Sequence, residues 1–520
     1  MLRPTFYSFE TAKRAVTAGQ YGLDIVGNNL SNMNTPGYTR QRVDQVSFVV
    51  NPRARYQIYG QQLPGQGAII SGISQIRDPS LDVRYRAESA NWGEFAVKST
   101  GLGEINKVFD EITSDGLNLQ IQKLIDAIAK MEESPTSQDY AMVVRTSAEQ
   151  ITSVMNLYAK DLNRVEEDLV GDLETTIAKD VNLVLQQIAE LNKQIEQQHI
   201  YGQQPNELLD ERNLLIDQIS ELVDVQVVYS EVKISEDRSI ERLSIKIKGT
   251  DQLLVKGKDY NQLELSTDIS GETKVPIEIN IIDNIITPGT PVTSEITDVL
   301  IKGGLKGYID ILNGAGNFSV SGDGTNDTRG IPYYRAAFDS MAHKFAEVMN
   351  NINAKDPTSG GSKPLFATSD GSAVITAKNI VISDSWRDNP NYLTASAKTD
   401  PGSLDNDVIL LFHAALGTNK YDFDNGGGNI ITGNFQEYFR IFQAEMGLDQ
   451  SLNNTLLTTS AKVMSNLMDS RDAISGVSMN EEATNMMVYQ NYYNAAIRYL
   501  TALDEAVNQI INGMGIVGRG

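Results

Sequence analysis

The sequence predicts a mainly helical, discontinuous multidomain rod in which β-rich segments interrupt a stem of long helices. Three observations lead to this fold class. Apolar residues near both ends of the chain recur at alternating steps of three and four, the spacing of a coiled-coil seam. A longer series of the same kind runs from Val144 to Ile195. Between Val225 and Ile286 the spacing drops to two, which indicates β-strands.

The composition disfavours several classes of function. The chain has 520 residues and a formal net charge of −23, which disfavours nucleic acid and anionic lipid as partners. It contains no cysteine, which excludes thiolate chemistry, and its three histidines offer few metal ligands. No apolar run approaches the roughly 18 residues of a membrane span, and the first residues lack the pattern of a cleaved signal peptide. We therefore expect no membrane insertion, and any export to follow another route.

The amino-terminal segment predicts one helix with an apolar seam. Gly19, Gly22 and Gly27 each cost roughly 1 kcal/mol relative to alanine in a helix, so this helix needs a partner to form. We interpret the small residues as points of close approach by neighbouring helices, in preference to a surface helix packed on its own domain. The predicted assembly seam comprises Phe9, Ala12, Val16, Gly19, Leu23, Val26, Leu30 and Met33.

A sharp break follows this helix. Pro36 disfavours helix at the residue before it, and Gly37 tolerates a turn. The residues around the break resemble the amino-terminal signature of the rod, hook and hook-associated proteins of the bacterial flagellum. The signature positions that this resemblance carries over are Asn28, Asn29, Asn34, Thr35, Pro36, Gly37 and Tyr38.

The next stretch predicts an extended arm followed by long helices. Turn residues alternate with short β-prone runs in the arm, and an aspartate before a proline is the usual start of a helix. The expected elements are the arm over Gln41 to Gln75, a helix with glycine interruptions from Asp78 toward Ile112, a helix over Leu119 to Met131, one long helix over Val144 to Ile195 whose heptad is interrupted near Gly171, and a helix from Pro205 to Leu222.

Two β-rich segments are expected to leave this stem. The polar loop 314–330 between them lacks the carboxylate spacing of a calcium-binding EF-hand, so a metal is not favoured there. The expected domains are a terminal coiled coil (1–38 and 478–520), a helical stem (39–224, 303–355 and 434–477), a β-rich outer domain (225–302) and a second β-containing insertion (356–433).

The carboxyl-terminal segment predicts a second helix with a seam, able to lie beside the first. Ser478 and Glu481 have the spacing of a capping box, and a helix from there to Met514 would be on the order of 50 Å long. Glu482 interrupts the apolar series. The seam positions predicted for assembly and for a chaperone are Met486, Tyr489, Tyr493, Ala496, Leu500, Leu503, Val507 and Ile510.

Two further resemblances narrow the family. Ser475 to Glu482 looks like the closing helix of the same flagellar proteins. Asn206 to Val225, reading NELLDERNLLIDQISELVDV, resembles a motif of the hook-associated protein 1 family, as do Leu191 to Ile195 and Gly304 to Ile309. The resemblance covers most of the chain. It implies a structural adaptor that joins hook to filament by self-assembly, with the terminal helices in an inner tube, the stem in the next shell and the β-rich parts outside.

The same resemblance implies the surroundings of the chain. The expected partners are copies of itself laterally in the axial ring, the hook protein, the next junction protein toward the filament, a flagellar export chaperone and the type III export apparatus. The expected location is the extracellular flagellum, reached without a cleaved signal peptide. The alternative is a secreted adhesin or other binding module that acts through its β-rich domains.

No residue pattern indicates catalysis. His343 and Glu347 lack the second histidine of the zinc-protease motif. His199 is explained as a cation at the end of a helix, and His413 as a packed core residue. Neither a nucleophile elbow nor a phosphate-binding loop is found. We therefore expect no enzyme activity, no catalytic residue, no metal site and no cofactor.

Overall fold

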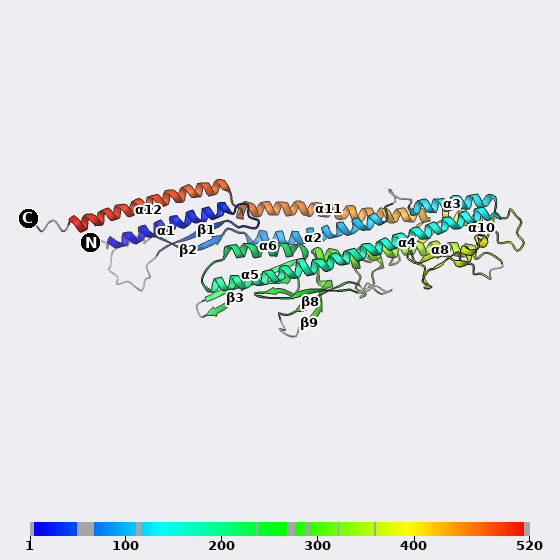
Figure 1. Ribbon diagram of the computed structural model, residues 1–520, viewed down its shortest axis with the longest axis horizontal. Coiled ribbons are helices and arrows are strands. Elements are labelled where there is room, and N and C mark those ends of the chain that lie inside the picture. The colour runs from blue at the N-terminus through cyan, green and yellow to red at the C-terminus, as the bar shows by residue number, and fades with distance from the viewer. Residues whose placement is uncertain are drawn as a thin grey trace, which may run out of the picture.

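The protein is a long rod in which the sheet of β3 and the sheet of β8 and β9 lie along one side of the helices (Figure 1). The structure is a computed structural model that describes residues 5–48, 67–110, 116–235, 238–267, 276–285, 292–320, 322–357 and 360–513. The predicted fold class, a mainly helical rod with β-rich insertions, is confirmed. Within these ranges, none of the helices combines the length and the apolar character that a membrane span requires.

The two terminal helices lie side by side at one end of the rod, as predicted (Figure 1). They run antiparallel, because Gly19 lies against Tyr493 while Asn29 contacts Glu482. The ends of the predicted arm form a two-stranded antiparallel sheet on the first helix, and residues 49–66 of the arm lie outside the described residues. The elements here are α1 (Thr5–Ser31), β1 (Gln41–Ser47), β2 (Ala68–Gln75) and α12 (Met479–Gly513).

The stem is organised around two long helices, α2 and α11, which run side by side. Asp78 starts α2 as predicted, because its side chain accepts the backbone N–H of Ser80 and Pro79 takes the first turn. The expected glycine interruptions do not break α2. Instead Gly93 lets another helix approach, since a Cβ there would lie 2.0 Å from the carbonyl oxygen of Glu221. The helices are α2 (Pro79–Val108), α6 (Asn206–Leu222), α7 (Gly304–Asn313) and α11 (Phe435–Ser475).

The long helix predicted over Val144 to Ile195, with its interrupted heptad near Gly171, is one continuous helical segment. Buried residues there repeat every four positions. In a uniform α-helix of 3.6 residues per turn, residues at that spacing would drift around the helix and would not stay on one face. A wider π-helical turn keeps them aligned. The aligned residues are Leu169, Leu173, Ile177, Val181 and Leu185. The segments are α3 (Leu117–Glu133), which packs on α4, then α4 (Gln138–Thr175), the π-turn (Thr176–Val181) and α5 (Asn182–Ile200).

Aromatic rings form the centre of the stem core. Phe109 meets Tyr158, Phe338 and Phe442 edge to face, with ring centroids 5.0 to 5.5 Å apart. The four rings come from the end of α2, from α4, from α8 (Ile331–Asn353) and from α11. One cluster therefore joins helices from four separate parts of the chain.

The alternating residues after Val225 form strands, as predicted. The inward-facing Ile245, Ile279 and Ile281 are fully buried. The first two sheets have the orders β3-β4-β5-β6 and β7-β8-β9, and β10 with β11 and β12 with β13 form two-stranded sheets. The bounds are β3 (Val225–Ser235), β4 (Arg238–Ile247), β5 (Leu253–Lys256), β6 (Asp259–Tyr260), β7 (Gln262–Ser266), β8 (Glu278–Asp283), β9 (Val292–Glu295), β10 (Phe366–Thr368), β11 (Ile380–Ile382), α9 (Asp384–Asp388), α10 (Asp407–Gly417), β12 (Tyr421–Asp424) and β13 (Ile430–Gly433).

Two histidines differ from their predicted environments. His413 is not a core residue, because its imidazole is half-exposed and its Nδ1 lies 2.6 Å from Oε1 of Glu132. His199 does lie in the last turn of α5, but burial and the nearby charge of Arg212 lower its pKa, which favours the neutral ring over the expected cation.

Candidate functional site

The predicted seam of α1 is buried at alternate positions. Ala12, Gly19 and Val26 are buried. Met33 does not belong to the helix, because α1 ends at Ser31 and Met33 lies in the turn that follows. The remaining seam residues, Phe9, Val16, Leu23 and Leu30, are partly buried.

Glycines allow the close approach of α1 and α12. A Cβ on Gly19 would lie 3.1 Å from Cβ of Tyr493, and a Cβ on Gly22 would lie 2.3 Å from the ring of Tyr489. The tyrosines of α12 therefore occupy space that only glycine leaves free. The prediction that small residues mark close approach holds for these two positions and fails at Gly27, where a Cβ would meet nothing within 4 Å.

The predicted seam of α12 faces α1 over most of its length. Ala496 is buried, and Ile510 is 48% exposed and lies outside the contact. Met514, the last residue of the predicted helix, is outside the described residues. The partly buried seam residues are Met486, Tyr489, Tyr493, Leu500, Leu503 and Val507.

A second apolar stripe on α12 is exposed. Most residues of this stripe stand one position before a residue of the first seam, which places them about 100° around the helix from it. They too are separated by steps of three and four residues. Its larger members stay open to solvent, with Val488 at 58% and Tyr499 at 47% exposure. Sequence reasoning missed this stripe, although reading the same heptad one position earlier would have found it. Its residues are Val488, Tyr492, Ala495, Tyr499, Ala502, Ala506 and Ile510.

The signature residues after α1 close a hydrogen-bonded turn. Asn29 is buried, and its Oδ1 accepts the backbone N–H of Gln41 and the hydroxyl of Tyr38, both at 2.9 Å. Burial, with the charges of nearby carboxylates, raises the pKa of Tyr38 to about 12, so this hydroxyl stays a donor. Gly37 has a φ of 78°, a left-handed conformation that favours glycine.

The same residues fold back on themselves or stay open to solvent. Asn28 accepts two bonds from the side chain of Asn32, at its backbone and side-chain oxygens. Asn34, Thr35 and Pro36 are exposed at the tip of the turn. The structure thus divides the predicted signature into a buried part, Asn29, and an exposed tip.

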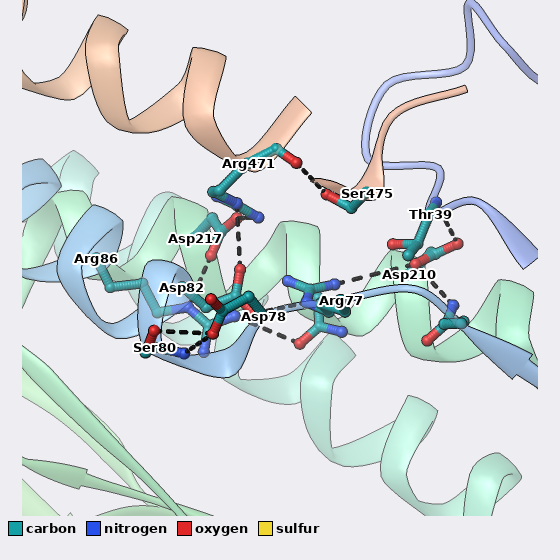
Figure 2. A network of polar contacts seen from close by, with 12 residues as sticks. Thr39, Arg77, Asp78, Ser80, Asp82, Arg86, Asp210, Asp217, Arg471 and Ser475 are labelled. Carbon is teal, nitrogen blue, oxygen red and sulfur yellow. Dashed lines mark hydrogen bonds and ion pairs between the residues drawn. The ribbon is translucent and has the colours of Figure 1, made fainter. Parts of the chain in front are cut away.

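A polar network, which we call the joint, ties together the stem helices α2, α6 and α11 near the points where the chain leads to β1 and to α12 (Figure 2). Arginines and aspartates alternate along it, with N···O distances of 2.5 Å for Arg77 to Asp82, 3.1 Å for Arg471 to Asp82 and 2.9 Å for Arg471 to Asp217. It extends through Arg86, whose Nε lies 2.7 Å from Asp217. Burial is the largest single effect and acts to lower the pKa of Arg77. The bond to Asp82 and the charges of Asp82, Asp217 and Asp210 together outweigh it and raise that pKa, so the guanidinium stays charged.

Asp210 of α6 ties the joint to the chain that leaves α1. Its carboxylate accepts the backbone N–H of Thr39 at 2.9 Å and Nε2 of Gln75 at 2.8 Å, and Arg77 lies 4.0 Å away. Burial nevertheless raises the pKa of Asp210. The joint was not predicted, because its residues come from segments far apart in sequence and each alone reads as a solvated charge.

The arrangement is suited to holding helices together. Across the described residues, no three histidines or carboxylates lie close enough together to hold a metal ion. The charges of the joint are paired with each other. What it can do is fix how the α1 and α12 pair is mounted on the stem.

The comparisons with known sequences all match this chain to flagellar proteins. The model of the flagellar hook-associated protein FlgK helical domain matches residues 102–366, and that of the flagella basal body rod protein matches residues 9–39. Flagellar hook-associated protein 1 of Bacillus subtilis is 30% identical, with 99% of each chain covered. The protein of the same name from Salmonella typhimurium is 20% identical over 96% of this chain and 98% of its own.

A solved structure has the same fold. The flagellar hook junction protein FlgK from Burkholderia pseudomallei superposes with a TM-score of 0.59. The match covers 76% of this chain and all of that one, at 13% sequence identity.

Proposed function

The chain belongs to the flagellar hook-associated protein 1 family, and from this premise we propose that it is a structural adaptor that joins the flagellar hook to the filament. It works by assembling with copies of itself and with the adjoining axial proteins. It catalyses no reaction and needs no cofactor. A secreted adhesin, the alternative from the sequence, is not favoured because the family is a structural one.

The second stripe of α12 carries this proposal. A helix in a closed tube touches a neighbour on each side, so it needs two apolar seams. On α12 the first seam is covered by α1 of the same chain, whereas Val488, Tyr492 and Tyr499 of the second are exposed. In the tube, the second seam is covered by a terminal helix of the adjacent copy. Residues 1–38 and 478–520 would then form the inner tube, with the stem outside it.

The partners follow from the same surface. An exposed apolar stripe invites aggregation, so a chaperone that covers α12 before export would keep the chain in solution. Export through the flagellar type III apparatus would deliver it to the extracellular flagellum. There the hook protein lies on one side of the ring of copies and the next junction protein on the other.

A charge placed in the second seam tests the proposal. Val488→Asp and Tyr499→Asp each put a carboxylate where a neighbour should cover it, which costs several kcal/mol in the assembly but little in the free chain. We expect cells with either variant to make hooks without attached filaments. Asn494→Asp is the matched control, because it adds the same charge at an exposed site away from both seams.

Electron microscopy of the cells and the circular dichroism of each purified chain separate the outcomes. The proposal predicts filaments with Asn494→Asp, none with the two seam variants, and the same helix content in all three chains. Normal filaments in both seam variants would contradict it.

A further inference from the structure

Glu482 is an anomaly in the first seam of α12. The other positions of that seam are apolar or aromatic, yet this carboxylate is only 1% exposed. A buried charge is tolerated only where polar groups surround it, and it seldom adds stability over an apolar residue of similar size. Its presence therefore calls for a reason other than stability.

Three donors surround the carboxylate. Oε1 accepts Nε of Arg40 at 2.8 Å and Nδ2 of Asn485 at 3.3 Å. Oε2 accepts Nδ2 of Asn29, on α1, at 3.1 Å. The second arm of the Arg40 guanidinium reaches Glu481, which does not form the predicted capping box with Ser478. The carboxylate is thus paired with a guanidinium and bonded both to helix α1 and to the residue that precedes β1.

Arg40 also fixes this cluster to the stem through its backbone. Its N–H donates to the carbonyl oxygen of Ser475, the last residue of α11, at 2.9 Å. Its own carbonyl accepts the N–H of Ile76 at 2.8 Å. A shift of α12 along α1 would therefore break the bonds of Glu482 to Asn29 and to Arg40.

The heptad spacing of the apolar residues does not by itself define the position of α12. A heptad seam looks alike after a slide of seven residues, which is about 10 Å along the helix. One such slide would bring Ala496 opposite Gly22 and Leu500 opposite Gly19, and each is smaller than the tyrosine it replaces. The same slide would move Tyr489 and Tyr493 to positions opposite Asn29 and Val26, so it keeps the heptad spacing but loses the fit of the tyrosines to the glycines.

We propose that Glu482, Asn29 and Arg40 form a register lock, which selects one alignment of α12 on α1 among those that the apolar seams permit. A buried polar group can specify the register of a coiled coil because every other alignment leaves it unpaired. The lock is a property of the helix pair within one chain and does not depend on the proposed role in the flagellum. It would give every copy the same outer surface.

Disulfide trapping can measure the alignment, because the chain has no cysteine of its own. Gly19→Cys with Tyr493→Cys reports the observed register, since the two Cβ atoms would lie 3.1 Å apart, within a few tenths of an ångström of the disulfide range. Gly19→Cys with Met486→Cys and Gly19→Cys with Leu500→Cys report slides of one heptad in either direction. On the purified full-length chain, a linked band at monomer mass marks a bond within one chain.

Glu482→Leu makes the seam continuous and removes the lock. With it, we expect the two slid pairs to link about tenfold more than with Glu482 present, because a charged hydrogen bond no longer favours one alignment. Glu482→Gln keeps an acceptor for Asn29 and Arg40 and should link in the observed register only. Glu505→Gln, at an exposed carboxylate of α12 that takes no part in the cluster, is the control and should behave as the parent chain does.

Two outcomes would overturn the proposal. If the Glu482→Leu variant forms a disulfide only in the observed register, the apolar seam or the short connection 476–478 sets the alignment. If that variant forms a disulfide in none of the three pairs, Glu482 is needed for the helices to pair at all, and not for choosing among alignments.

Discussion

The terminal helix pair and the stem both have apolar residues at steps of three and four, but the fraction of these side chains that is buried differs greatly. In α4, Ile151, Met155 and Leu173 are completely buried. Of the α12 side chains that the structure describes, only Glu482 and Ala496 are buried. Since burial of apolar surface is the main source of stability, α4 is completed within one chain and α12 is not. The same spacing can therefore form either a core that is buried within one chain or an interface that becomes buried only when another chain binds.

The largest effect should follow from cutting the stem core. Phe338→Ala removes a buried ring that contacts Phe109 and Phe442, so we expect a loss of about 3 to 5 kcal/mol in the free energy of unfolding. Urea titration followed by circular dichroism measures it. Leu448→Ala is the control, because Leu448 is 67% exposed and its loss should change stability by less than about 0.5 kcal/mol. If both substitutions lowered the free energy of unfolding equally, the distinction between the buried and exposed faces of the stem helices would be contradicted.

A smaller effect of opposite sign is expected at Asp339, where the stem is not optimised. Its carboxylate accepts the N–H of Ala377 at 2.7 Å, and burial raises its pKa to about 6. Because that pKa lies above the unfolded value, its contribution to stability is present below about pH 4 and lost as the pH rises through about 6. Asp339→Asn should therefore stabilise the stem by up to about 2 kcal/mol at pH 7.5.

Urea titrations at pH 4 and pH 7.5 check the sign of this effect. The gain from Asp339→Asn should shrink toward zero at the lower pH, where the native carboxyl is itself neutral. A loss of stability at pH 7.5, or a gain that does not change with pH, would contradict the assignment.

The smallest effect concerns the fit of the terminal pair. Gly22→Ala places a methyl group 2.3 Å from the ring of Tyr489. It should weaken the packing of α1 on α12 by about 1 kcal/mol. Gly27→Ala meets no neighbour and should instead favour α1 by about 0.5 to 1 kcal/mol through helix propensity. Amide exchange of α1 should accelerate several-fold in the first variant and slow in the second. The same response in both would mean that close approach at Gly22 is unimportant.

The elements of the fold could be predicted from the sequence, whereas the joint could not. Local signals placed the start of α2 at Asp78 and the strands after Val225, because caps and alternation are written in neighbouring residues. The pairing of Arg77, Asp82, Asp217 and Arg471 depends on three helices meeting, which no local pattern encodes. Glu482 illustrates the limit: in sequence it interrupts a seam, and in the structure it is the most specific contact within that seam.

Hydrogen exchange tests the central claim, that the terminal pair is completed by neighbouring copies, most directly. Exchange would be followed on the purified full-length chain and on isolated hook-filament junctions, with α4 as the internal reference. We expect slow exchange in α4 in both states, and exchange along Leu500, Leu503 and Val507 that is fast in the free chain and slow after assembly, because few side chains of α12 are buried in one copy. Protection of α12 in the free chain equal to that of α4 would contradict the account.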